Sequence, residues 1–291
     1  MSHQPVLVRE ATDLLVWDRR GTYVDATLGW GGHTEAIVEA CAPDGRVVGL
    51  DRDGEAVASA RERLTVHAAR LLLVQGNFAD LKTLLNASGI GIVHGVLFDL
   101  GISSTQLDDS GRGFSFRQEG PLDMRMDRGG GPTAGEILRT APADRLAQII
   151  ENFGEERWAT RIARRVAEYR RRHPLRTTQD LADCVLRAVP KPMAHKSLAR
   201  VFQALRIAVN GELEALKKGL DQARDLLISR GRLVVLSYHS LEDRIVKETF
   251  RESPELRVLT KKPLRAGEEE IVRNPRAKSV KLRAAEKGSG T

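Results

Sequence analysis

A glycine-rich stretch near the amino terminus constrains the fold more than any other part of the chain. From Thr22 to Thr34 it reads TYVDATLGWGGHT. The β-branched and aromatic residues at its start predict a strand, and the apolar residues behind it predict a helix. A helix that begins behind a glycine turn presents unpaired N–H groups to a polar ligand. The stretch therefore predicts a strand–turn–helix unit in which Gly31 and Gly32 let a ligand approach the main chain.

An acidic residue at the end of the next predicted strand indicates the kind of ligand. Residues 46–51 read as a strand that ends in Asp51, 20 positions after Gly31. A carboxylate at that place commonly accepts hydrogen bonds from the two ribose hydroxyls of a nucleoside. The dinucleotide pattern G-x-G-x-x-G, counted from Gly29, would need glycine where this chain has Thr34. S-adenosylmethionine is therefore the preferred ligand, with a dinucleotide and a purely structural turn as the alternatives.

Strands and helices alternate up to residue 104. Strands are predicted at 22–28, 46–51, 71–76 and 93–100, with helices at about 33–41, 54–66 and 78–87 between them. Such alternation produces a parallel sheet with crossover helices, which is an α/β fold. The third strand is almost continuously apolar, so we expect it to be buried on both faces.

Other residues at strand ends are expected to face the same crevice, because ligands of an open parallel sheet bind beyond the carboxyl ends of its strands. Asp99 ends the fourth strand and either contacts the ligand or caps the following turn. Phe78 follows the third strand and either packs on an adenine ring or belongs to the core at a helix start. His239 lies two residues beyond the end of a fifth strand at 232–237, which follows a helix predicted from about 197 to 228. Residues 258–260 and 280–283 are candidates for a closing antiparallel pair.

A segment that is mostly helical, residues 105–205, interrupts this alternation. It opens with a long polar loop in which arginine alternates with aromatic residues, namely Arg112, Phe114, Phe116 and Arg117. These two residue types together suit stacking on unpaired bases. The helix predicted at 155–172 carries many arginines and few acids, and those expected to contact phosphate are Arg161, Arg164, Arg165 and Arg171. Alternatively, these arginines form an ordinary solvent-exposed face of the helix that contacts no phosphate.

Composition agrees with a soluble protein that has a polyanionic partner. The chain has 291 residues, 41% of them hydrophobic, and a formal net charge of +7. Cys41 and Cys184 lie far apart without the spacing of a metal site, so we expect no metal and two reduced thiols. No apolar run reaches membrane length, and the first residues do not read as a signal peptide. We therefore expect a cytoplasmic location.

Several motifs together resemble those of the bacterial 16S rRNA (cytosine-N4)-methyltransferases. They are DATLGWGGH at 25–33, DLGISS at 99–104, QLDD at 106–109, RGFSFR at 112–117, GPLDMRMD at 120–127, FQALRI at 202–207 and HSLEDRIV at 239–246. The resemblance extends over essentially the whole chain, from His3 to Arg276. Two departures stand out. The segment 195–200 lacks the usual proline and threonine–arginine pair, and Tyr238 stands where phenylalanine is usual.

The resemblance implies a class I (Rossmann-like) S-adenosylmethionine-dependent methyltransferase domain made of residues 1–104 and 206–291. Residues 105–205 would be a helical insertion that recognises rRNA. The implied reaction transfers a methyl group from S-adenosylmethionine to N4 of cytidine 1402 of 16S rRNA, in the decoding centre of the small ribosomal subunit. A homodimer is a possible state of the protein. The implied cofactor contacts are Gly31, Gly32, His33, Asp51, Phe78, Asp99 and Gln106.

Asp99 and His239 are the candidate catalytic residues. Many amino-methyltransferases have Asp/Asn-Pro-Pro-Tyr at the end of the fourth strand, whereas this chain has Asp99-Leu-Gly-Ile. Asp99 could therefore serve the cofactor, the target amine or both, and His239 is the alternative acceptor for a proton. Two rival functions remain: an assembly factor with a vestigial cofactor pocket, and a methyltransferase for a protein or small molecule. The arginine-rich segments argue against the second.

Overall fold

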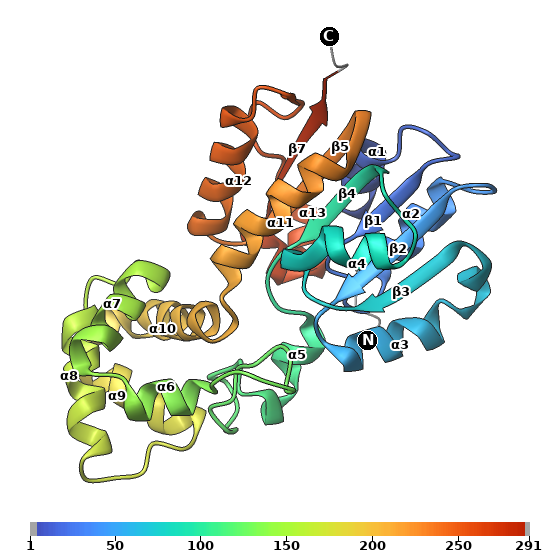
Figure 1. The fold of residues 1–291 in the computed structure, drawn as a ribbon. Helices are drawn as coiled ribbons and strands as arrows, with labels where there is room; N and C mark the ends of the chain where they lie inside the picture. Colours follow the sequence, from blue (N-terminus) through green and yellow to red (C-terminus); the bar gives the residue numbers. More distant parts are fainter. Residues whose placement is uncertain (1–4, 289–291) are drawn as a thin grey trace. The chain divides into compact units, whose positions relative to one another are not determined.

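The computed structural model describes residues 5–288, so His3 lies outside the described residues. These residues form two compact units (Figure 1). The residues up to Gly101 and those from Leu213 onward make up the sheet unit, and Ile102–Glu212 make up the helical unit. The helical unit extends beyond residue 205 because the last turn of its final helix is bonded to its own loop, as described below.

The sheet unit contains a seven-stranded sheet in the order β3-β2-β1-β4-β5-β7-β6. The strands are β1 (Thr22–Asp25), β2 (Arg46–Asp51), β3 (Leu71–Gln75), β4 (Val93–Asp99), β5 (Leu227–Ser237), β6 (Leu256–Val258) and β7 (Lys281–Lys287). Strands β1 to β5 are parallel, and β7 is antiparallel to both of its neighbours. The strand order reverses between β1 and β4, which is the switch point of a doubly wound sheet. The predicted α/β class and Rossmann-like topology are confirmed.

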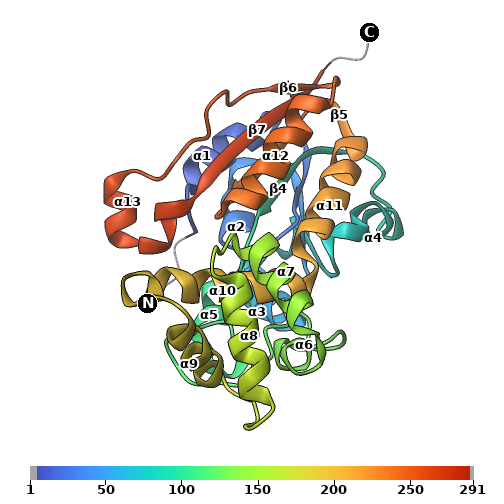
Figure 2. The same ribbon diagram turned by 90° about the vertical axis from the view of Figure 1, so that its left-hand side faces the viewer.

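Helices cover both faces of this sheet (Figures 1 and 2). One face packs against α1 (Val8–Leu15), α2 (Gly32–Ala40) and α3 (Gly54–Arg63). The other face packs against α4 (Leu81–Ala87), α11 (Glu212–Leu226) and α12 (Ser240–Glu252). The shorter elements of this unit are η1 (Thr65–Arg70), η2 (Phe78–Asp80), α13 (Glu268–Arg273) and η5 (Pro275–Ser279). The central strands contribute fully buried side chains to the core, among them Tyr23, Phe98 and Val234.

Two expectations about these elements are wrong. Strand β3 is not buried on both faces, because it is an edge strand that pairs only with β2, and Leu72 is 39% exposed. The helix expected from about 197 to 228 is two helices. Gly211 has a φ of +60° and ends α10 (Ala194–Asn210), and α11 then begins at Glu212.

The helical unit packs its helices around one apolar core. Its elements are α5 (Ser104–Asp108), η3 (Ser110–Arg112), α6 (Ala134–Thr140), α7 (Ala143–Gly154), α8 (Ala159–Arg170), α9 (Thr178–Ala188), η4 (Lys191–Met193) and α10. Capping boxes start α6 at Thr133 and α9 at Thr177. The core includes Met124, Leu138, Ile150, Ile162, Val185 and Val201. None of the helices described in either unit has the length and apolar character that a membrane crossing requires.

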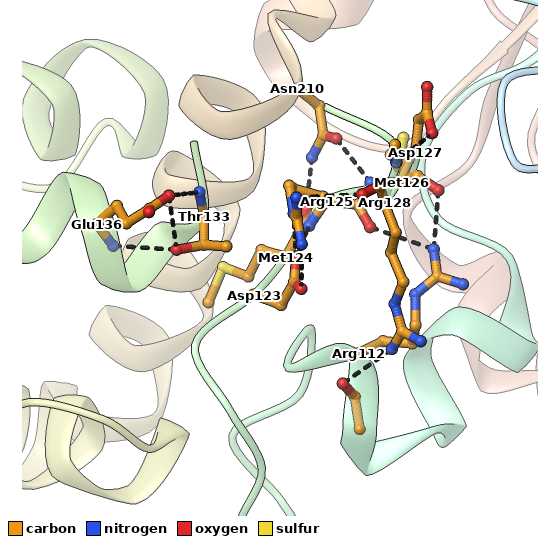
Figure 3. A network of polar contacts seen from close by, with 12 residues as sticks. Arg112, Asp123, Met124, Arg125, Met126, Asp127, Arg128, Thr133, Glu136 and Asn210 are labelled. Atoms are coloured by element: carbon orange, nitrogen blue, oxygen red, sulfur yellow. Dashed lines mark hydrogen bonds and ion pairs between the residues drawn. The ribbon is translucent and has the colours of Figure 1, made fainter. Parts of the chain in front are cut away.

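The long loop at the start of the helical unit is fixed by polar contacts (Figure 3). The guanidinium of Arg112 donates through Nη2 to the carbonyl oxygens of Arg125, at 3.1 Å, and Met126, at 2.8 Å. The amide of Asn210, at the end of α10, accepts the Met126 N–H at 2.9 Å and donates to the Met124 carbonyl at 2.8 Å. These bonds join the loop to the last turn of α10, so the loop is an ordered part of the unit.

Candidate active site

Acidic residues meet at the carboxyl edge of the parallel strands. Asp25 ends β1, Asp51 ends β2 and Asp99 ends β4. Tyr238 and His239 follow β5, which pairs with β4. This edge includes the switch point between β1 and β4, where open α/β sheets bind their ligands. The sequence predicted the placement of Asp51, Asp99 and His239, but it indicated no role for Asp25 or Tyr238.

The turn between β1 and α2 needs glycine, because of its backbone conformation and its close neighbours. Gly29 and Gly31 have φ values of +50° and +78°, which other residues adopt rarely. A Cβ atom on Gly31 would lie 2.7 Å from Cδ1 of Leu64, and one on Gly32 would lie 2.7 Å from Cγ of Pro5. Gly31 is also the N-cap of α2 and offers no side-chain cap. The N-cap position therefore supplies no side-chain acceptor to the first-turn N–H groups of this helix, which suits an anionic ligand group.

The carboxylate of Asp51 is held by backbone N–H groups. Its Oδ2 accepts the N–H of Gly29 at 2.8 Å, and its Oδ1 accepts the N–H of Asp53 at 2.9 Å. Burial raises the pKa of Asp51 to about 6, although these two hydrogen bonds oppose the rise. Each carboxylate oxygen has two lone pairs, so each can accept a second hydrogen bond. The group is thus a fixed double acceptor, as two neighbouring hydroxyls require.

Asp99 is held from two sides. Its Oδ1 accepts the hydroxyl of Tyr238 at 2.8 Å, and its Oδ2 lies 3.5 Å from Nε2 of His33. The Asp99 side chain is 24% exposed, whereas that of His33 is 5% exposed. Burial opposes the charged form of His33, but the nearby carboxylate of Asp99 outweighs it, so the pKa of His33 is raised. The imidazole of His33 therefore supports Asp99 from inside the fold.

Asp25 lies beneath this group and has no exposed surface. Its Oδ2 accepts the hydroxyl of Thr34 at 2.7 Å, and its Oδ1 accepts the N–H of Thr27 at 3.2 Å. Burial raises the pKa of Asp25, while the charge of His33 and the Thr34 hydroxyl act against the rise. Asp25 therefore fixes the turn and the first residues of α2.

His239 is the N-cap of α12. Its Nδ1 accepts the N–H of Glu242 at 3.4 Å, and Oε2 of Glu242 accepts the N–H groups of Tyr238, at 2.9 Å, and His239, at 3.4 Å. An accepting Nδ1 leaves the proton of a neutral imidazole on Nε2, which lies 3.1 Å from Oε1 of Glu242. His239 lies at the expected strand end, but both ring nitrogens face groups of its own helix start.

Phe78 belongs in part to the core. Its ring packs edge-on against Phe98, with centroids 5.4 Å apart and an interplanar angle of 85°. Its Cδ2 would lie 2.8 Å from a Cβ atom on Gly219 of α11, so the absence of a side chain there makes room for the ring. Phe78 is half-buried, and contact with an adenine through its exposed part stays a prediction.

Comparison with known proteins decides the family. The model of the MraW methylase family matches residues 1–288 of the chain. The chain belongs to this family. A relative from Trichlorobacter lovleyi is 48% identical over 306 residues, covering 98% of each chain, and one from Desulfotalea psychrophila is 48% identical over 288 residues, also covering 98% of each. Both relatives carry the name ribosomal RNA small subunit methyltransferase H.

A solved structure of a putative rRNA-methylase from Clostridium thermocellum aligns over all of both chains, at 14% identity and a TM-score of 0.49. That likeness is too distant to add to the assignment. The family and the topology together make this chain a methyltransferase with a Rossmann-like sheet unit.

Three residues of the helical unit of this methylase are engaged within that unit. Oε1 of Gln106 accepts the N–H of Ser103 at 3.1 Å in the capping box of α5. Arg112 is 3% exposed and bonds the loop described above, and Phe114 is 5% exposed. The side chains of Arg112 and Phe114 are thus buried within the unit, and contact of either with RNA stays a prediction. Sequence alternation could not reveal this burial.

The remaining candidates of the loop differ from each other. Phe116 is half-buried and packs edge-on against His195 and Phe202, at centroid distances of 5.5 and 5.3 Å. Arg117 is exposed. Of the four loop residues, Arg117 alone presents an exposed side chain, so it is retained as a candidate for RNA contact.

The arginines of α8 and its C-terminus form an exposed basic surface. Arg161, Arg164 and Arg171 are exposed, and no carboxylate of residues 5–288 forms an ion pair with any of them. Arg165 differs, because it is half-buried and lies 3.6 Å from Glu168. The guanidinium of Arg161 also lies over the ring of Trp158, at 5.9 Å from the centroid. We define Arg161, Arg164 and Arg171 as the α8 basic surface.

Proposed function

We propose that this methylase transfers a methyl group from S-adenosylmethionine to N4 of cytidine 1402 of 16S rRNA, in the decoding centre of the small ribosomal subunit. The family and the name of its relatives support a methyltransferase for small-subunit rRNA. The motif resemblance supports the cytosine amine as the target. The observation that carries the proposal is the carboxylate of Asp99, fixed by Tyr238 and His33 at the switch point of the sheet. Such a substrate implies a cytoplasmic enzyme.

The residues at the strand ends fit S-adenosylmethionine. The fixed carboxylate of Asp51 would accept the two ribose hydroxyls, and the start of α2 behind Gly31 would bind the carboxylate of the methionine part. Phe78 would contact the adenine. When bound, the cofactor supplies an electrophilic methyl group on a sulfonium. The residues of the chain orient the substrate amine and accept its hydrogen bond.

The chemistry of the target amine explains why an acceptor is needed. The lone pair of cytosine N4 is delocalised into the ring, so the amine is a poor nucleophile until it becomes tetrahedral. A carboxylate that accepts a hydrogen bond from N4–H orients the amine and stabilises the positive charge that develops on it. Asp99 would supply this acceptor. The target base must leave its stack before it reaches the site.

Nucleoside mass spectrometry of small-subunit rRNA tests the proposed function. In cells that lack this protein, we expect N4-methylation at cytidine 1402 to disappear, and the wild-type gene should restore it. A gene that encodes Asp99→Asn should restore little. Intact methylation in the deletion strain would refute the proposal. Full restoration by Asp99→Asn would instead show that methyl transfer does not need the Asp99 carboxylate.

We also propose that the α8 basic surface contacts rRNA phosphates. The variant Arg164→Gln with Arg171→Gln is expected to flatten the salt dependence of subunit binding. The log–log slope should fall by about 0.7–0.9 for each arginine that no longer neutralises a phosphate, because each such pairing releases counterions. Binding of S-adenosylmethionine should not change. The measurement is subunit binding at several salt concentrations.

A matched control removes the same charge from the sheet unit. Arg9 and Arg20 have side chains that are 90% and 83% exposed. The variant Arg9→Gln with Arg20→Gln should keep the wild-type slope. If both double variants change the slope equally, the effect reflects net charge alone and the α8 basic surface is an ordinary solvated face.

A further inference from the structure

Tyr238 contacts Asp99 through a hydrogen bond that the sequence did not predict. Register within the sheet pairs Asp99 with Leu236, so Tyr238 leaves β5 just beyond the end of β4. Its hydroxyl donates to Oδ1 of Asp99 at 2.8 Å. Burial and the nearby carboxylate raise the pKa of Tyr238 well above its usual range, so the phenol is a neutral donor at physiological pH.

The Tyr238 side chain is itself held in place. Its backbone N–H donates to Oε2 of Glu242 at 2.9 Å, which fixes the main chain at the start of α12. Its Cδ2 lies 3.6 Å from the position that a Cβ atom on Gly101 would occupy, so the ring packs beside the turn after β4. The hydroxyl is therefore presented to Asp99 by a ring with little freedom to move away.

Asp99 has further contacts within the sheet unit. Its backbone N–H donates to Oγ1 of Thr27 at 2.6 Å, and its Oδ2 faces the buried Nε2 of His33. Tyr238 supplies the hydrogen bond on Oδ1. With both oxygens oriented from within the fold, the 24% of the side chain that is exposed is the part that a substrate amine can reach.

We propose that Tyr238 is a positioning residue, whose hydroxyl holds the Asp99 carboxylate in the orientation that accepts a hydrogen bond from the substrate amine. The inference rests on the proposed role of Asp99 in methyl transfer. The variant Tyr238→Phe removes the hydroxyl and keeps the ring, so we expect it to fold.

The first test is a double-mutant cycle of Tyr238→Phe and Asp99→Ala in single-turnover methylation of small subunits at saturating S-adenosylmethionine. Tyr238→Phe is expected to lower the rate about 5- to 10-fold, with cofactor affinity within about 2-fold of wild type. In the Asp99→Ala background the same change should have no further effect, because the hydroxyl acts through Asp99. A wild-type rate for Tyr238→Phe, or the same 5- to 10-fold loss in both backgrounds, would overturn the proposal.

The second test needs no substrate. Asp99, Asp25 and Glu270 are the charged groups that act on His33. Removing the Tyr238 hydroxyl takes a competing donor from Asp99, so the pKa of His33 measured by NMR titration should rise in Tyr238→Phe. An unchanged titration would show that the hydroxyl does not act on Asp99. If wild-type protein transferred no methyl group while this shift was seen, the proposed function would fail and the positioning of Asp99 would stand.

Discussion

Methyl transfer by the Asp99→Asn variant is expected to be about 100-fold slower than by wild type, or slower still, the size of effect produced by losing an acid–base or acceptor group. The negative charge that favours the developing ammonium is gone. The amide carbonyl has two lone pairs, so it can accept N4–H as well as the Tyr238 hydroxyl, and a residual rate should remain. The fold should be intact, because the amide can still bond to Tyr238. The measurement is single-turnover methylation with saturating cofactor, so that weaker binding cannot resemble slower chemistry.

The control for this prediction is His239→Asn. Asparagine is a good N-cap residue, so this variant should preserve the start of α12 while removing the imidazole. Its rate should lie close to that of wild type. A normal rate for Asp99→Asn together with an inactive His239→Asn would assign the acceptor to His239 and overturn the role of Asp99.

Much of the sheet could be predicted because its signals are local. Alternating apolar runs marked β1, β2, β3, β4 and β5, and parallel strands place their carboxyl ends at one edge. Acids at the ends of these runs, such as Asp51 and Asp99, therefore had to share that edge. The capping boxes at Thr133 and Thr177 are equally local features, because the spacing of two side chains determines them.

The features that the sequence did not predict depend on packing between distant segments. An apolar run does not reveal whether a strand is central or at an edge, so the exposure of Leu72 in β3 was missed. The burial of Arg112 depends on carbonyl groups of residues 125 and 126, which a loop pattern does not specify. The bond between Tyr238 and Asp99 joins residues 139 positions apart and depends on the register of β4 with β5.

Cofactor affinity provides the second large expected effect, through Asp51. Replacement by alanine should weaken binding of S-adenosylmethionine by about 1.5–3 kcal/mol, or roughly 10- to 150-fold, because two hydroxyls lose a charged acceptor. Calorimetry measures the affinity, and the thermal midpoint of the unliganded variant serves as its control. Unfolding of the variant would be visible there, since Gly29 and Asp53 would also lose a hydrogen-bond partner.

The pH dependence of S-adenosylmethionine binding tests whether the negative charge of Asp51 contributes to the affinity. Because burial raises the pKa of Asp51 to about 6 in the unliganded protein, the carboxylate is mostly ionised at pH 7.5 and mostly protonated at pH 5. A ligand that needs the ionised double acceptor should therefore bind about 10-fold more weakly at pH 5 than at pH 7.5. In Asp51→Ala this difference should disappear, because the titrating group is gone. If wild type and variant showed the same pH profile, another group would control binding and Asp51 would not be the ribose acceptor.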